Sequence, residues 1–457
     1  MNKVKEHIVV VSLLLFILII LFNKVIIGGY VFASGDTLSP QAFKQAIVNI
    51  KSEYNYYGYW FPYIFSGMPT LHSFIGASDS YLPQKLIMFL HQLGMPWIWN
   101  FIIHYMFGGF GMYLLLRYLK QNKYSSFFGS SLFMISPYMV AYFVHGHGSQ
   151  MMTSAYIPWI ILYLFKIFKE TNLINFSLLA ILIGLQLQRG HIQIAYYTWL
   201  LIGLYIFIKI IKLFKNKIAF NYSEILKKYF FIFSSLLIGI VLALNIYLPV
   251  FNYTSNSTRG VSSGGMGLEL ATAWSLNFYE FITLIIPYSF GFGGSTYWGY
   301  FQFTDFANYI GLIILLLAVI GFYKSEIKLE HKLFFLFSII FSLLLASGKY
   351  AMFIYELFYN YLPFFDKFRA PVYFLIIFYF SILCLASIGL SNLIQLLKEK
   401  KSFNIFLSIL LLIIIFLFSM KEYDYESRYI YKLTGNSNID FTKHKNTILA
   451  LTKSKFD

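Results

Sequence analysis

Long apolar runs alternate with short polar segments along almost the whole chain. A helix needs about 20 apolar residues to cross the bilayer core, and roughly 17 is still enough. By this rule the pattern predicts eleven spans, at about 7–28, 98–119, 126–144, 154–169, 174–189, 193–214, 229–250, 307–323, 333–347, 371–395 and 402–420. No small-residue cleavage site stands clear after the first run, so we expect it to be a retained helix rather than a signal peptide.

Composition leads to the same fold class. Of the 457 residues, 58% are hydrophobic and only 12% are charged, whereas about a quarter of the residues in a soluble domain are charged. This balance excludes a soluble enzyme and a disordered chain. The single cysteine, Cys384, lies in an apolar run, so the chain can form no disulfide within itself. We therefore predict an all-α polytopic membrane protein.

The net charge of +16 comes from basic residues at the ends of the apolar runs. With the N-terminus in the cytoplasm, nineteen Lys and Arg residues fall on the inner side and nine in the much longer outer loops before the tail. Such an excess of inner positive charge is the usual orientation signal. The basic residues do not gather on one soluble face, so we expect no nucleic-acid partner.

This topology divides the chain into a transmembrane module, 1–420, and an outer tail, 421–457. The module has long outer loops at 29–97, 251–306 and 348–370. The first of these is too long for a simple connector. Within it, LPQKLIMFLHQLG at 82–94 predicts a short amphipathic helix on the membrane surface.

The polar motifs all fall on the outer side. Asp36 follows the first span between Gly35 and Thr37. A carboxylate close to the membrane boundary can serve as a general base or a metal ligand. The alternative is an aspartate that caps a turn or a helix.

HGHGSQ contributes His145, His147 and Gln150 at the outer end of the third span. A metal site would need a third ligand from elsewhere in the chain. We therefore favour hydrogen bonding to a polar substrate, with a polar interfacial turn as the alternative.

QLQRGHIQ places Arg189, His191 and Gln193 between two apolar runs with almost no loop. Polar side chains at membrane depth are costly and usually mark a functional path. The planar guanidinium of Arg suits two-point recognition of phosphate. A snorkelling interfacial arginine is the alternative interpretation.

Similar outer-face residues recur later, with Arg259 in STRG, Asp305 in FTDF, and Asp366 and Arg369 in DKFRAP. Asp366 and Arg369 are close enough in sequence to pair with each other. The glycine-rich GFGGSTYWG at 291–299 lacks the order of a P-loop, so it predicts no nucleotide site.

The order of these motifs, from GDTLSP and WFPYIFSGMPT through HGHGSQ, LQLQRGH and STRG to FTDF, resembles the YfhO family of bacterial membrane proteins. The resemblance runs from about Gly35 to Pro371. That family is similar to the GT-C glycosyltransferases, multi-span enzymes that use polyprenyl-phosphate sugars on the outer face. Family members often continue into an outer domain, so the resemblance implies that 421–457 is the start of one. It also implies that Asp36 is the catalytic carboxylate and that Arg189, His191, Arg259 and Arg369 line the donor phosphate and the acceptor. From their own polar character we add further candidate substrate-binding residues: His145, His147, Gln150, Gln193 and Asp305.

The resemblance therefore implies a membrane glycosyltransferase of the bacterial cytoplasmic membrane, with a cell-envelope glycan or lipid as acceptor. Glycosyl transfer passes through an oxocarbenium-like state, which calls for a base at the acceptor and positive charge at the departing phosphate. We expect Asp36 and Arg189 to fill these roles. A divalent metal is compatible with this chemistry but not required by it. The alternative function is a transporter or flippase of lipid or polysaccharide precursors, which would place polar groups at the midplane in repeated halves.

Overall fold

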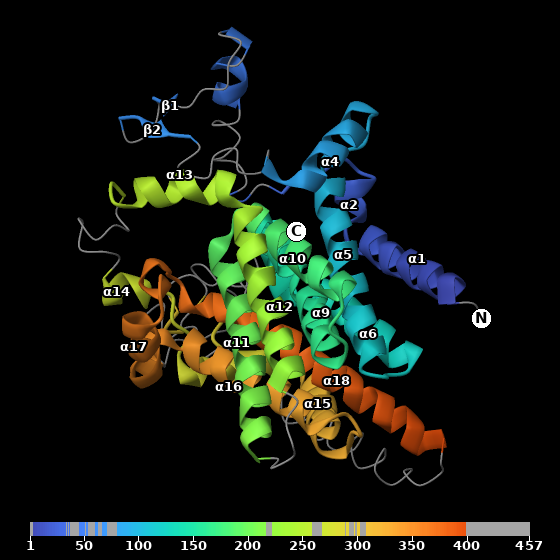
Figure 1. Ribbon diagram of the computed structural model, residues 1–457. Helices are drawn as coiled ribbons and strands as arrows, with labels where there is room; N and C mark the ends of the chain where they lie inside the picture. The colour runs from blue at the N-terminus through green and yellow to red at the C-terminus, as the bar shows by residue number, and fades with distance from the viewer. Residues whose placement is uncertain are drawn as a thin grey trace, which may run out of the picture.

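The computed structural model describes residues 3–32, 34, 36, 45–50, 52–53, 60–62, 66–70, 80–215, 222–257, 267–287, 289–291, 297, 299–301 and 308–398. Helices make up most of these residues (Figure 1). The α-helices in the first half are α1 (Lys3–Leu21), α2 (Asn23–Ile26), α4 (Leu82–Gln92), α5 (Trp99–Tyr118), α6 (Lys123–Met134), α7 (Pro137–Val144), α8 (Gly148–Ser154), α9 (Ile157–Lys169), α10 (Leu173–Gln188) and α11 (Ile192–Lys215).

The second half continues with α12 (Tyr222–Val241), α13 (Leu244–Thr254), α14 (Leu268–Ala271), α15 (Leu312–Lys324), α16 (Leu329–Ala346), α17 (Met352–Tyr361) and α18 (Leu375–Lys398). Short 3-10 helices lie at Phe278–Leu284, Gly348–Ala351, Phe365–Lys367 and Pro371–Phe374. One small hairpin departs from the all-α expectation. Strands β1 (Trp60–Phe61) and β2 (Met68–Pro69) pair antiparallel within the long first loop.

The structure is compatible with an all-α membrane protein: six helical segments within the described residues are long and apolar enough to cross a bilayer, and the expected count of eleven is not confirmed. A seventh is added if α12 and α13, bent by 76° at their junction, count as one span. Helices α10 and α15 are apolar but shorter. The expected span at 402–420 lies outside the described residues. The amphipathic helix expected at 82–94 is present as α4.

Helix starts follow the local sequence closely. Asn122 caps α6 by accepting a hydrogen bond from the backbone N–H of Ser125 at 2.9 Å, and Asn172 caps α10 through Asn175 in the same way. Ser136 caps α7, which then begins with Pro137. These residue types satisfy the free N–H groups of a first helical turn, so they fix where the spans begin.

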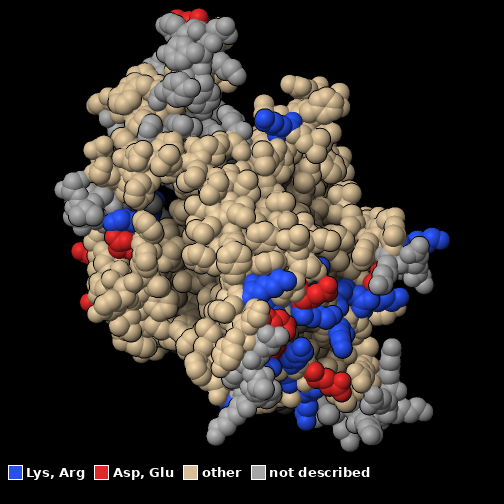
Figure 2. Space-filling model, viewed as in Figure 1, with Lys and Arg blue, Asp and Glu red and all other residues tan. Residues whose placement is uncertain are grey.

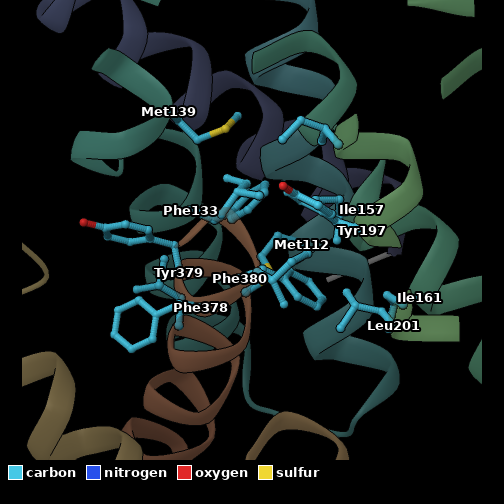
Figure 3. Packing of buried hydrophobic residues seen from close by; sticks show 14 of the residues in the cluster. Met112, Phe133, Met139, Ile157, Ile161, Tyr197, Leu201, Phe378, Tyr379 and Phe380 are labelled. Carbon is cyan, nitrogen blue, oxygen red and sulfur yellow. The ribbon is translucent and has the colours of Figure 1, made fainter. Parts of the chain in front are cut away.

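The core is built around α18, which packs against α6, α15 and α16. Figure 3 shows Phe380 of α18 near Met112 and Phe133 in this core, and the rings of Phe133 and Phe380 lie 6.2 Å apart. Glycines let α15 and α18 approach closely. A Cβ added at Gly321 would lie 2.0 Å from the Leu385 carbonyl oxygen, and one at Gly389 would lie 1.9 Å from that of Leu317. Small residues at such contacts are typical of membrane helix packing.

The bundle has two chemically different ends. We call the end at which α5, α9, α11 and α15 finish the lysine end, because Lys residues cluster there. Figure 2 shows that the charged atoms of the visible face gather mostly near the lower ends of α6, α9 and α12. We call the opposite end, which carries the turns around HGHGSQ, QRGH and FRAP, the motif end.

Candidate functional site

The HGHG turn at the motif end presents His147 to the surface. Gly146 takes a positive φ of 84° between α7 and α8, a conformation that suits glycine. The Nε2 atom of His147 lies 2.9 Å from Oδ2 of Asp36, 111 residues away in the chain. The Asp36 side chain is 70% exposed and that of His147 is 24% exposed. The carboxylate is therefore held at one oxygen and open to an incoming molecule.

Tyr373, which does not stand out in the sequence, lies near several of the expected site residues. The side chain of Gln150, the third residue of α8, lies close to the Tyr373 hydroxyl. The charges of Asp36 and Arg369 both act on the same hydroxyl, and the ring of His191 lies 6.2 Å from the Tyr373 ring. We call this group of side chains the Tyr373 cluster: Asp36, His147, Gln150, His191, Arg369 and Tyr373.

Gln193 positions the segment that carries Arg369. Its Nε2 donates to the backbone carbonyl of Arg369 at 2.6 Å, where the chain turns through a left-handed Ala370 with φ of 56°. The guanidinium of Arg369 is exposed and lies over the Trp274 ring at 5.4 Å. Gln193 therefore holds the backbone at Arg369 in place, while the side chain of Arg369 is exposed at the surface.

The other expected site residues fall in different places. His145 is half-buried at the end of α7, two residues before His147. Asp366 pairs with its neighbour Lys367 rather than with Arg369. Arg259 and Asp305 lie outside the described residues. Within the described part of the chain, no group of three His, Cys, Asp or Glu side chains is arranged to hold a metal ion.

Arg189 belongs to a second, buried group. Arg189 is the first residue after α10, and only 6% of its surface is exposed. The guanidinium carbon lies 4.4 Å from the centre of the Tyr81 ring, and Nη2 contacts the Met152 sulfur at 3.2 Å. Its charge also acts on Tyr156 and His104. We call these residues the Arg189 cluster: Tyr81, His104, Met152, Tyr156 and Arg189.

A chain of hydrogen bonds orders the Arg189 cluster. Nδ1 of His104 lies 2.7 Å from the Asn100 carbonyl, so this nitrogen is the donor and Nε2 is left as the acceptor. The Tyr81 hydroxyl, 3.1 Å from that Nε2, therefore donates to it and accepts from Tyr156 at 2.5 Å. Burial raises the pKa of the Tyr81 hydroxyl, which keeps it a donor at neutral pH.

Helix α8 separates the two clusters. Gln150 faces Tyr373, whereas Met152 faces Arg189. Two residues apart on a helix, these side chains diverge by about 200°. The sequence led us to expect Asp36 and Arg189 at one site, and the structure instead places them in neighbouring groups on different sides of α8.

No family model, curated protein or solved structure matches the chain. The assignment of function therefore depends on the order of the motifs and on the geometry of the two clusters.

Proposed function

We propose that the chain is a GT-C-type membrane glycosyltransferase with eleven spans, which moves a sugar from a polyprenyl-phosphate donor to a cell-envelope glycan or lipid. The observation that carries the proposal is the Asp36–His147 pair, 2.9 Å apart and accessible at the motif end, with Arg369 in the same cluster. The resemblance of the motif order to the YfhO family supports it.

In the proposed reaction the acceptor hydroxyl oxygen attacks the anomeric carbon of the sugar. The bond from that carbon to the phosphate oxygen breaks, and the phosphate leaves with the electron pair. Asp36, held by His147, takes the proton of the hydroxyl, and Arg369 stabilises the negative charge that develops on the phosphate. General-base assistance of this kind typically contributes about 10²–10⁴-fold to the rate.

The test is transfer from a labelled polyprenyl-phosphate sugar by the full chain reconstituted in vesicles. Asp36→Asn keeps the shape of the side chain but removes the proton acceptor, so we expect transfer to fall at least about 100-fold. Asp366→Asn is the matched control, because this carboxylate lies at the same end but pairs with Lys367. A loss below about tenfold for Asp36→Asn would be too small for a general base.

We further propose that the motif end faces outward from the bacterial cytoplasmic membrane and that the N-terminus is cytoplasmic. The proposal is supported by the Lys and Arg residues at the opposite end, because positive loops usually stay inside. A reporter fused after Met420 should read as outer. A cytoplasmic reading would move the Tyr373 cluster to the wrong side for an outer-face donor.

A second candidate function, translocation of a lipid precursor, is favoured by one observation. Helices α12 and α13 are bent by 76° at their junction, and α13 contains Pro249. Broken spans of this kind are typical of transporters. A fluorescent lipid phosphate that crosses the bilayer unchanged, at a rate unaffected by Asp36→Asn, would favour this function over sugar transfer.

A further inference from the structure

Arg189 is a buried cation without a charge partner. Among the described residues no carboxylate pairs with it, and two of its three nitrogens, Nε and Nη1, have no hydrogen-bond acceptor. Burying an unpaired charge is strongly unfavourable. Arg189 is only 6% exposed, so this unfavourable burial is offset only when a bound ligand supplies the missing hydrogen-bond acceptor.

The free N–H groups of Arg189 are arranged for two-point binding. A guanidinium has five N–H donors in a planar fork. They form two edges, each with two parallel N–H groups: Nε with Nη2, and Nη1 with Nη2. The Met152 sulfur, 3.2 Å from Nη2, can occupy only one of these edges, and a thioether is a weak acceptor. One complete edge with two parallel N–H groups is therefore left without an acceptor among the described residues, and such an edge has the geometry that carboxylate and phosphate oxygens fit.

The rest of the Arg189 cluster is neutral and already oriented. Tyr156, Tyr81 and His104 form one hydrogen-bonded chain that ends on the Asn100 carbonyl. The Oδ1 atom of Asn100 is itself buried without a donor. A single negative group next to Arg189 would thus meet one full positive charge and, among the described residues, no competing anion.

Helix α4 connects this cluster to the membrane surface. Tyr81, which covers Arg189, is the residue before α4, and the backbone N–H of Leu82 donates to the side chain of Gln188 at 3.1 Å. The outward face of α4 exposes Leu82, Leu86 and Phe89. Helix α4 therefore has an apolar outer face, and the residue before its first turn covers Arg189.

We propose that the Arg189 cluster is a binding site for one phosphate oxyanion, supplied by the headgroup of an anionic lipid that enters past α4. The proposal does not require sugar transfer. It concerns a site separate from the Tyr373 cluster, and binding is measured without any reaction.

The test is binding to the purified full chain in maltoside micelles, which contain no phosphate. The probes are dioctanoyl phosphatidate, inorganic phosphate, and dioctanoylglycerol, which has the same chains without the phosphate. Arg189→Met should weaken phosphatidate binding at least about tenfold, because charge-assisted hydrogen bonds are lost. Arg189→Lys keeps the charge but loses the two-point edge, so its binding should also weaken.

Lys85→Met is the matched control, since Lys85 is an exposed cation on α4, and surface charges contribute little. Its affinity should stay within about twofold of the wild type. If the chain binds phosphatidate but not inorganic phosphate, the bound phosphate belongs to a lipid headgroup. If it binds both with equal affinity, the ligand is a free oxyanion. The proposal is overturned if the wild-type chain binds neither phosphate probe, if dioctanoylglycerol binds as well as phosphatidate, or if Lys85→Met weakens binding as much as the Arg189 variants do.

Discussion

The two ends of the helix bundle differ in whether their buried charges are paired. At the lysine end, Glu330 is almost fully buried and is paired with Lys209 at 2.7 Å and with Lys212. Glu6 and Arg117 pair there as well, at 3.2 Å. At the motif end, Arg189 is equally buried but has no carboxylate among the described residues.

The contrast separates charges that hold the fold together from charges that are kept available. A buried ion pair offsets the loss of hydration of each partner, so the pairs at the lysine end join helices α11 to α16 and α1 to α5. An unpaired buried cation has no such compensation. The ligand proposed for the Arg189 cluster would supply that compensation at the motif end.

The largest effect should come from breaking a pair at the lysine end. Glu330→Gln leaves Lys209, whose side chain is 18% exposed, buried without its counter-charge. Removing one partner of a buried pair typically costs about 3–5 kcal/mol. The free energy of unfolding in detergent should fall by that amount, while Lys212→Gln should cost far less because that side chain is 51% exposed. Equal losses in the two variants would show that burial does not set the strength of these pairs.

Gln188 offers a test of how the motif end is held together without charges. Its amide accepts from the Leu82 N–H at 3.1 Å and donates to the Leu242 carbonyl at 2.7 Å, at the bend between α12 and α13. Gln188→Leu leaves both backbone groups without these partners, which should cost about 1–3 kcal/mol in unfolding free energy. Hydrogen exchange at the start of α4 should rise in parallel. An unchanged exchange rate there would mean that Gln188 does not anchor α4.

Tyr81→Phe tests how much the neutral hydrogen-bonded chain beside Arg189 contributes to stability. The change removes the hydroxyl that joins Tyr156 to His104 but keeps the ring that covers Arg189. We expect a loss of about 1–3 kcal/mol in unfolding free energy, because His104 Nε2 and the Tyr156 hydroxyl are left buried without this partner. Tyr156→Phe is the comparison, because it removes the other hydroxyl of the same bond. A much larger loss for Tyr81→Phe would point to a structural role for the whole chain of hydrogen bonds.

The smallest effect is expected at the partly exposed pair of the lysine end. Arg117 is 37% exposed in its side chain and Glu6 is 17% exposed. Arg117→Met should therefore cost no more than about 1 kcal/mol, since exposed pairs contribute little, and added salt should reduce the difference. A cost as large as that of Glu330→Gln would remove the distinction between the buried pair and this one.

Much of the fold could be predicted from the sequence because membrane helices depend on local apolar runs. The runs that begin near residues 7, 98 and 371 are found as α1, α5 and α18, and Asn and Ser caps mark several starts. The bend between α12 and α13 was not predicted. Pro249 lies inside α13 rather than at the bend, so the nearest sequence signal points to the wrong residue.

The candidate site was predicted less completely. Asp36, His147, Gln150, His191 and Arg369 stand out because polar groups are rare in an apolar chain, and the structure brings all five around Tyr373. Tyr373 itself stands in an ordinary aromatic run, PVYFLIIFYF, so only the tertiary contacts reveal it. His104 offered a usable signal, an ionisable side chain inside an apolar run. The separation of Arg189 from Asp36 depends on the direction of two side chains on α8, which no sequence spacing specified.

The most direct test of the contrast between the ends is the stability of Arg189→Met in phosphate-free maltoside, measured beside Glu330→Gln. Methionine removes an unpaired buried charge at similar volume, so the variant should be as stable as the wild type or up to about 3 kcal/mol more stable. A loss of stability comparable to that of Glu330→Gln would contradict the account, because Arg189 would then be a structural charge like those at the lysine end.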